Sequence, residues 1–220
     1  MTDCEFLKDF ITVKLENHDT KVHSTFSMAL RDARLITGRD KETGKFKGFW
    51  LKNRKREHLK PYSPIGILNY LIVLELIGKI FMGNKTEDEK TGIPAALSQF
   101  SELNEKERYT IDAFRNGLAH GYSLVNIPRN KSNNKNSRHK FVYYDPFRDD
   151  IPLIEFPEKP WNGEFNEQDE HSNTRINVGK LFNLIEDIIS KVHSGIENNE
   201  IKLKIEMPEL KSRYLLSAYP

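Results

Sequence analysis

The chain has 220 residues, of which 37% are hydrophobic and 30% are charged, a composition typical of one soluble globular domain. The 34 lysine and arginine residues nearly balance the 32 aspartate and glutamate residues. The resulting net charge of +2 excludes a global field for nucleic acid, so any such role must come from local basic patches. The single cysteine, Cys4, excludes an internal disulfide and favours a reducing compartment.

The sequence also favours a cytoplasmic protein with no membrane partner. Acidic residues stand near its start, where a signal peptide would be basic, and no long apolar run follows them. The most apolar stretch, residues 65–82, is interrupted by Asn69, Glu75 and Lys79, which a membrane span rarely tolerates. We expect Glu75 either to lie on the exposed side of this stretch or to be paired.

Four helices are predicted in the first half of the chain. Apolar residues recur at helical spacing over residues 4–15 and 22–36. A third helix is predicted over residues 63–81, with serine as its N-cap and Pro64 in its first turn; because it is apolar on most sides, it should be central and buried. A short helix follows over residues 93–103.

The segment 37–61 between the second and third of these helices is basic. It contains nine lysine and arginine residues interleaved with Phe46, Phe49 and Trp50, and its glycines favour a loop or a short hairpin. Such a segment could hold an RNA backbone and stack its bases. The alternative is a solvated loop whose aromatic residues fold back onto the core. The RNA-binding candidates are Lys47, Trp50, Lys52, Arg54, Lys55 and Arg56.

A loop and a small β-hairpin are predicted in the second half of the chain. Residues 126–140 are rich in Asn, Lys, Arg and Ser, and their part from 131 onward is a second candidate surface for RNA. Residues 141–144 and 153–156 are predicted to pair as a hairpin whose turn starts at Asp145-Pro146.

The remaining residues divide into three predicted segments. Residues 157–174 are polar and are expected to be irregular. Residues 176–196 have helical periodicity, with Glu186 and Asp187 expected on the solvated side. The alternation of apolar and polar residues after Asn199 predicts an edge strand.

The stretch that points to chemistry is residues 109–124, YTIDAFRNGLAHGYSL. Its apolar spacing predicts an amphipathic helix that begins after Asn104 as the cap. Arg115 has the planar, permanently charged fork that suits phosphate, and His120 can move a proton near neutral pH. Asn116 adds a neutral donor and acceptor. Together these residues favour phosphoryl or phosphodiester chemistry.

The spacing of these residues permits a shared site without requiring one. On an ideal helix Asn116 and His120 lie on one face, whereas Arg115 and His120 are about 140° apart. Gly117 and Gly121 would allow the helix to loosen or end nearby.

Arg115, four intervening residues, His120, one residue and Tyr122 resemble the R-x-x-x-x-H-x-Y signature of the HEPN domain family, in which an Asn directly after the Arg is common. The resemblance covers about a dozen residues and their helical context. It implies a mainly α fold, an up-and-down helical bundle. The predicted small β-hairpin appendage and the long tail depart from the family pattern, because they make this chain longer than a minimal HEPN toxin. Residues 1–220 would form one domain, with the basic loop at 37–61 and the hairpin insertion at about 126–175.

The resemblance further implies a metal-independent endoribonuclease of toxin or defence type that acts as a homodimer without a cofactor. Attack of the RNA 2′-hydroxyl on its own phosphate needs a base and an acid, which two His120 side chains from a symmetric dimer could supply. Arg115 would stabilise the phosphorane charge and Asn116 would orient the phosphate or His120. By resemblance, Tyr122 is a supporting group or the hydroxyl that a nucleotidyltransferase-type antitoxin modifies.

Two other functions remain open, namely a catalytically inactive module that binds nucleotide or nucleic acid and a protein-interaction bundle. In a purely structural alternative Arg115 pairs with Asp112, Asn116 bonds locally, and His120 lies near a helix C-terminus, where a cation is favoured. The other histidines lack the paired spacing of a zinc site, so we expect no metal. No phosphate-binding loop, dinucleotide-binding turn or nucleophile elbow is present in the sequence.

Overall fold

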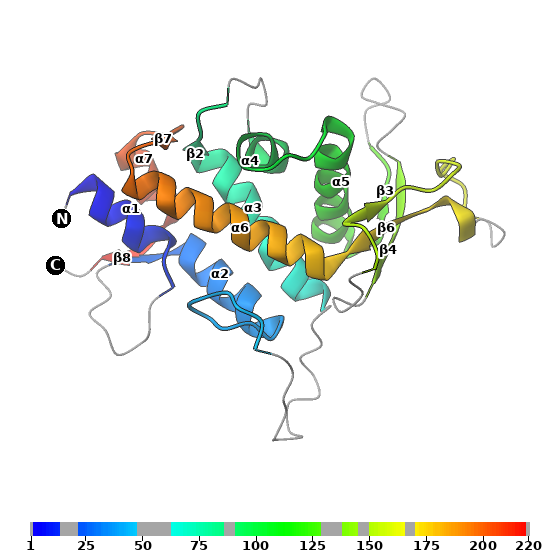
Figure 1. The fold of residues 1–220 in the computed structure, drawn as a ribbon, viewed down its shortest axis with the longest axis horizontal. Coiled ribbons are helices and arrows are strands. Elements are labelled where there is room, and N and C mark those ends of the chain that lie inside the picture. Colours follow the sequence, from blue (N-terminus) through cyan, green and yellow to red (C-terminus); the bar gives the residue numbers. More distant parts are fainter. Residues whose placement is uncertain are drawn as a thin grey trace, which may run out of the picture.

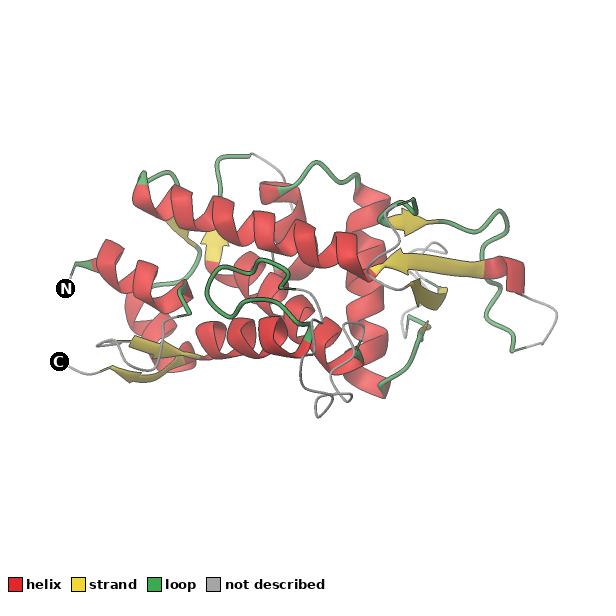
Figure 2. Ribbon diagram, turned by 60° about the horizontal axis from the view of Figure 1, so that its bottom comes forward, coloured by secondary structure: helices red, strands yellow, loops and turns green. Residues whose placement is uncertain are grey.

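A computed structural model describes residues 2–13, 22–47, 63–85, 91–128, 138–144, 150–165 and 170–218 of the chain (Figure 1). This part is mainly helical, as predicted, with small sheets at its margins (Figure 2). The helices are α1 (Asp3–Ile11), α2 (Thr25–Ile36), α3 (Pro64–Ile80), α4 (Gly92–Phe100), α5 (Glu105–Gly121), α6 (Val178–Glu197) and α7 (Met207–Tyr214). The strands are β1 (Val22–Ser24), β2 (Phe81–Met82), β3 (Val125–Asn126), β4 (His139–Tyr144), β5 (Ile154–Glu155), β6 (Asn173–Asn177), β7 (Lys202–Leu203) and β8 (Leu215–Ala218).

Helix α3 is the central helix of the molecule, as its apolar sequence predicts. It packs against α2, α4, α5 and α6, and residues on several of its sides, including Tyr70, Leu71 and Val73, are fully buried. The helix begins at Pro64, but Ser63 makes no side-chain hydrogen bond as a cap. No helix in the described ranges is both long and apolar enough to cross a lipid bilayer.

The predicted β-hairpin is wrong, because β4 and β5 do not pair with each other. The sheet has the order β3-β4-β6-β5, and β6 lies between the two strands, parallel to β4 and antiparallel to β5. The predicted irregular segment therefore ends in a strand, and the following helix begins at Val178 rather than at residue 176. The strand is polar in sequence, but Thr174 and Ile176 point into the protein interior.

Two antiparallel ribbons join distant parts of the chain. β1 pairs with β8 and β2 pairs with β7. The predicted edge strand after Asn199 is confirmed at β7 but wrong at Met207, where α7 begins. The two N-terminal helices are shorter than predicted, since α1 ends at Ile11 and β1 occupies the start of the second predicted helix.

Candidate active site

Helix α5 carries the Arg-Asn-His motif, and its first turn is closed as predicted. The Asn104 side chain accepts a hydrogen bond from the Glu107 backbone N–H at 3.0 Å, and the Glu107 carboxylate accepts one from the Asn104 N–H at 2.9 Å. This reciprocal pair satisfies two N–H groups that a helix start leaves without partners. The apolar face of α5, formed by Ile111, Phe114 and Leu118, is buried in the core. The motif residues therefore lie outside this buried face of a fixed helix.

The chain reverses at the C-terminal end of α5. Tyr122 adopts the left-handed conformation, with φ of 48°, and the Ser123 N–H donates to the Gly117 carbonyl at 3.1 Å. The returning chain passes so close to the helix that a Cβ atom at Gly117 would lie 2.9 Å from the Ser123 carbonyl oxygen and 3.1 Å from that of Val125. Gly117 thus permits β3 to lie against the last turns of α5.

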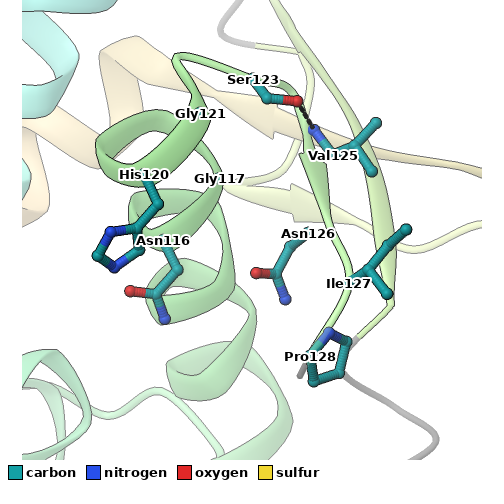
Figure 3. Close-up of a pocket in the computed structure, with 9 residues that line it drawn as sticks. All are labelled: Asn116, Gly117, His120, Gly121, Ser123, Val125, Asn126, Ile127 and Pro128. Atoms are coloured by element: carbon teal, nitrogen blue, oxygen red, sulfur yellow. Dashed lines mark hydrogen bonds between the residues drawn. The ribbon is translucent and has the colours of Figure 1, made fainter. Parts of the chain in front are cut away.

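An open pocket of about 470 Å³ lies between α5 and β3 (Figure 3). It is lined by Asn116, Gly117, His120 and Gly121 from the helix and by Ser123, Val125, Asn126, Ile127 and Pro128 from the returning chain. His120 is exposed in the last turn of α5, one turn from Asn116. The expectation that these two side chains share a face of the helix is confirmed.

Arg115 lies on the side of α5 that faces α3. Its Nη2 atom is 2.5 Å from Glu75 Oε2, and Lys79 Nζ is 2.6 Å from the other oxygen of that carboxylate. Of the two expectations for Glu75, pairing is the one observed. Asp112, the local alternative as a partner for Arg115, instead accepts a hydrogen bond from Asn116 Nδ2 at 3.1 Å.

A hydrogen bond connects the Arg115 side chain to the pocket. Arg115 Nη1 donates to Asn116 Oδ1 at 3.0 Å, so the Asn116 amide is held between Arg115 and Asp112. The Arg115 Nε atom is buried without a hydrogen-bond partner among the described residues. The structure therefore brings Asn116 and His120 into one pocket and places Arg115 behind Asn116 rather than in the lining.

The remaining candidates from the sequence lie elsewhere. Tyr122 is 60% exposed just beyond the pocket lining. Lys47 is exposed and pairs with Asp40. The other RNA-binding candidates, Trp50, Lys52, Arg54, Lys55 and Arg56, lie outside the described residues, as does most of the second basic segment near residues 131–137.

Asn126 and Ser123 line the pocket although the motif in the sequence does not include them. Asn126 opens the Asn- and Lys-rich segment that was predicted to be a loop, and in the structure it belongs to β3. Gly117 is the feature of the sequence that could have indicated the returning chain beside α5, since a glycine inside a helix often marks the close approach of another backbone.

A second polar cluster was also missed, and it corrects the prediction for Glu186 on α6. The Glu186 carboxylate accepts two hydrogen bonds from Arg34, at 2.9 and 2.7 Å, and one from the Tyr70 hydroxyl at 2.6 Å. Glu186 is therefore paired beneath the surface, whereas Asp187 is exposed as predicted. Glu186 follows Phe182 by four residues and precedes Ile189 by three, a spacing that places it on the apolar face of α6.

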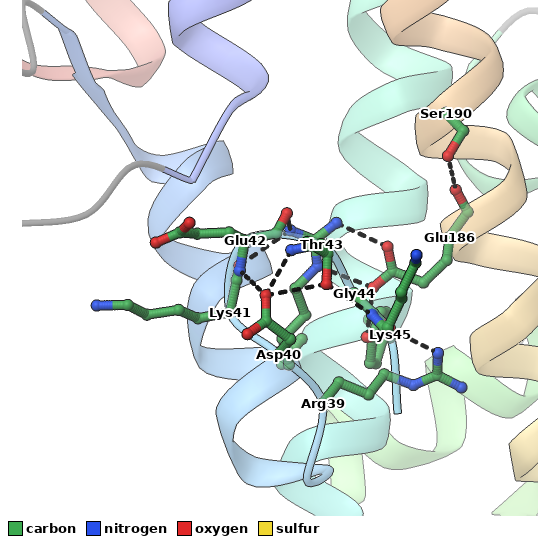
Figure 4. Close-up of polar contacts among 12 residues, drawn as sticks. Arg39, Asp40, Lys41, Glu42, Thr43, Gly44, Lys45, Glu186 and Ser190 are labelled. Carbon is green, nitrogen blue, oxygen red and sulfur yellow. Dashed lines mark hydrogen bonds and ion pairs between the residues drawn. The ribbon is translucent and has the colours of Figure 1, made fainter. Parts of the chain in front are cut away.

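The loop after α2 closes over this cluster (Figure 4). Arg34 Nη1 donates to the carbonyl oxygens of Lys41 and Glu42, at 2.9 and 2.7 Å. Gly44 has φ of +68° and lies against the Glu186 carboxylate, where a Cβ atom would overlap it. Burial and the adjacent Glu186 carboxylate hold the pKa of Tyr70 far above its usual value, so the Tyr70 hydroxyl stays protonated and donates. This cluster fixes α2, α3 and α6 together and has a structural role.

No group of three or more His, Cys, Asp or Glu side chains that could hold a metal ion occurs in the part of the chain that the structure describes. No family model, curated protein or solved structure matches this chain. The chemistry of the pocket and of the adjoining Arg115 must therefore support any functional proposal.

Proposed function

We propose that this protein is a metal-independent endoribonuclease of the HEPN type, built on that family's helical bundle. The observation that supports the proposal is that the exposed His120 imidazole and the Asn116 amide share one pocket, while the Arg115 guanidinium binds the same amide from behind. A proton-transfer group, a neutral orienting group and a permanent cation thus lie within two turns of one helix.

The proposed reaction needs no cofactor. One imidazole accepts the proton of the RNA 2′-hydroxyl as its oxygen attacks the adjacent phosphorus, and the bond from phosphorus to the 5′-oxygen breaks. A second imidazole, in its protonated form, donates a proton to the leaving 5′-oxygen. The products are a 2′,3′-cyclic phosphate and a 5′-hydroxyl. Because each chain supplies one motif histidine, two His120 side chains must meet in a symmetric homodimer.

Arg115 is proposed to stabilise the negative charge that develops on the phosphorane oxygens. Its guanidinium is shared with Glu75, and the Glu75 carboxylate is itself balanced by Lys79. These contacts hold the Arg115 side chain beside Asn116 even when no ligand is bound. The exposed Tyr122 hydroxyl is the proposed site at which a nucleotidyltransferase-type antitoxin would silence a toxin of this kind.

The test is incubation of the purified protein with end-labelled mixed RNAs in EDTA. We expect the wild type to cut and to leave 2′,3′-cyclic ends, and we expect His120→Ala and Arg115→Ala each to reduce the rate by a factor of about 100 or more. His193→Ala is the matched control, since His193 is another partly exposed helical histidine, on α6, and does not line the pocket. Cutting that persists in His120→Ala would contradict the mechanism.

A catalytically inactive RNA-binding module is the second candidate, and the Arg115–Glu75 ion pair favours it. A guanidinium already neutralised by a carboxylate 2.5 Å away is less available to a phosphorane. For this candidate we expect salt-sensitive RNA binding with no cutting by any variant. If RNA neither binds nor is cut, the protein-interaction bundle is favoured instead.

A further inference from the structure

The Glu75 carboxylate connects the central helix to the motif arginine, and its two oxygens are divided between two cations. Its Oε2 atom lies 2.5 Å from Arg115 Nη2, and its Oε1 atom lies 2.6 Å from Lys79 Nζ, one turn further along α3. A guanidinium is shaped to bind both oxygens of a carboxylate at once. Arg115 therefore shares Glu75 with a second cation instead of binding it as a complete fork.

The Arg115–Glu75 pair differs in this respect from the structural pair of Arg34 with Glu186. Arg34 donates from Nε and Nη2 to both oxygens of its carboxylate, and its side chain is only 6% exposed. The Arg115 side chain is 21% exposed, and its Nε has no hydrogen-bond partner among the described residues. A guanidinium held in this way exchanges one anion for another more readily than a buried, bidentate one.

Glu75 lies directly against the charge that the proposed function assigns to the phosphorane. An RNA phosphate bound by Arg115 would lie near the Glu75 carboxylate, and like charges in a half-buried site repel each other. The Glu75 charge therefore lowers the affinity of the motif for phosphate. Removal of that charge with little change of shape should raise the affinity.

Lys79 supplies the cation that Glu75 needs when Arg115 leaves it. A carboxylate that is largely removed from water is destabilising when it has no cation. Lys79 and Glu75 are four residues apart on α3, a spacing that places their side chains together without any contribution from α5. Glu75 therefore stays paired if the Arg115 guanidinium turns to another anion.

We propose that Glu75 is a positioning residue that acts through Arg115. It holds the guanidinium beside Asn116 in the free protein and competes for it with an RNA phosphate, and Lys79 compensates Glu75 when the phosphate binds. The RNA ligand rests on the proposed function, and the competition by Glu75 goes beyond it. The ion pair is then compatible with an active enzyme and sets how tightly RNA binds.

Binding of a fluorescent 2′-O-methyl oligonucleotide of mixed sequence to the full chain tests this inference by anisotropy. The probe keeps its phosphates but lacks the nucleophilic 2′-hydroxyl, so it is not cut by the proposed reaction. We expect Glu75→Gln to lower the dissociation constant about tenfold, because it removes the competing charge and keeps the size of the side chain. In the Arg115→Ala background the same substitution should change the dissociation constant less than about twofold.

Two further variants separate competition at Arg115 from a change in overall charge. Glu209→Gln removes the same charge and releases Arg213 on α7, away from α5 (Figure 1), so it should change the dissociation constant less than about twofold. Glu75→Asp keeps the charge beside Lys79 but shortens the side chain that reaches Arg115, and it should tighten binding about threefold. Thermal unfolding establishes that each variant is folded, and Glu75→Asp keeps the inference testable if Glu75→Gln does not fold.

Three results would overturn the proposal. The first is an affinity that Glu75→Gln leaves unchanged or weakens. The second is an equal gain in affinity in the Arg115→Ala background, since the effect would then not pass through the guanidinium. The third is the absence of binding by both the wild type and Glu75→Gln.

The two proposals fail separately. If the wild type cuts RNA in EDTA, Glu75→Gln should lower KM by about the factor by which it lowers the dissociation constant. A loss of kcat at unchanged KM would leave the nuclease intact and assign Glu75 a purely structural role. Tighter binding that depends on Arg115, without cutting by any variant, would retain the competition and favour the inactive RNA-binding module.

Discussion

Arg34 illustrates how a charged side chain can be accommodated almost completely inside this protein. Its guanidinium donates four hydrogen bonds, two to the Glu186 carboxylate and two to backbone carbonyl groups, and the residue is only 5% exposed. The charge is paired and its donors are satisfied, which is the condition under which a buried ion is tolerated. Loss of the arginine would remove two of the three side-chain hydrogen bonds described for the Glu186 carboxylate and would leave the one from Tyr70.

We therefore expect Arg34→Met to lower the free energy of unfolding by about 3–5 kcal/mol, because it leaves a buried carboxylate without its cation. Urea denaturation followed by circular dichroism measures this loss. Arg213→Met is the control, since the exposed pair of Arg213 with Glu209 on α7 should contribute less than about 1 kcal/mol. Equal losses in the two variants would contradict the structural role assigned to Arg34.

The contacts of the Asp40 carboxylate make the stability of the protein depend on pH. Its carboxylate pairs with Lys47 and accepts hydrogen bonds from the Thr43 and Glu42 N–H groups, at 2.7 and 3.0 Å. The bond to Lys47 and the backbone bond from Thr43 hold its pKa well below the usual value of 3.8. The Asp40 carboxylate therefore binds a proton less readily in the folded state than in the unfolded state. Its contribution to stability is present above about pH 4 and is lost as the pH falls below that value.

Asp40→Asn should consequently show a smaller decline in the free energy of unfolding between pH 6 and pH 3 than the wild type. Urea titrations at the two pH values measure the decline. Asp187→Asn, at an exposed position on α6, should retain the wild-type decline. If Asp40→Asn shows the same decline in the free energy of unfolding as the wild type, the Asp40 carboxylate does not cause the acid dependence.

The sequence was sufficient to predict the placement of residues whose partners are local. Helical spacing placed Asn116 and His120 on one face, and the Asn104 cap follows from its position before two glutamates. It left the partner of Arg115 undetermined, because Glu75 lies forty residues earlier on another helix and only packing of α3 against α5 brings the two together. Glu186 was misassigned for the same reason, since its cation is supplied by α2.

At the scale of elements, α3 and α4 pack at a point where neither helix has a side chain. A Cβ atom at Gly78 would overlap the Gly92 carbonyl oxygen and would lie 2.9 Å from the Ala96 nitrogen. The obstruction is backbone, which cannot rotate away as a side chain can. The pair therefore determines how closely the two helices approach.

Gly78→Ala should lower the free energy of unfolding by about 3 kcal/mol or more, because overpacking of a buried contact is added to the displacement of α4. Gly121→Ala provides the comparison, since the nearest atom to its Cβ would be a side-chain carbon at 3.3 Å and alanine favours the helix. Thermal and urea unfolding measure both changes. Tolerance of Gly78→Ala would mean that α3 and α4 pack less closely than described.

The helices could be predicted and several of the strands could not. The helices have long apolar faces that repeat along the sequence, and burial of those faces is what stabilises them. The strands are two to six residues long, and β6 is polar at four of its five positions. Its place between β4 and β5 depends on pairing across the sheet rather than on any local pattern, so a hairpin between the apolar segments was the simpler but incorrect prediction.

At the scale of the whole molecule, the proposed mechanism requires two chains. We expect a homodimer in solution, measured by light scattering during gel filtration. If each site uses two His120 side chains, equal amounts of wild type and His120→Ala, allowed to exchange subunits, should retain only about a quarter of the activity of the same total amount of wild type. Retention of about half would mean that each chain acts alone with its own histidine.

The β1–β8 and β2–β7 ribbons affect how a newly synthesised chain folds, because each pairs an early strand with a late one. β1 and β2 emerge from the ribosome well before β8 and β7, the strands with which they pair. Until residues 202–218 have been made, those edges lack their partners, and Leu210, fully buried in the finished molecule, is not yet present to cover the core. A chain interrupted during translation is therefore expected to remain open to proteases, and completion of its last strands protects the finished product from degradation.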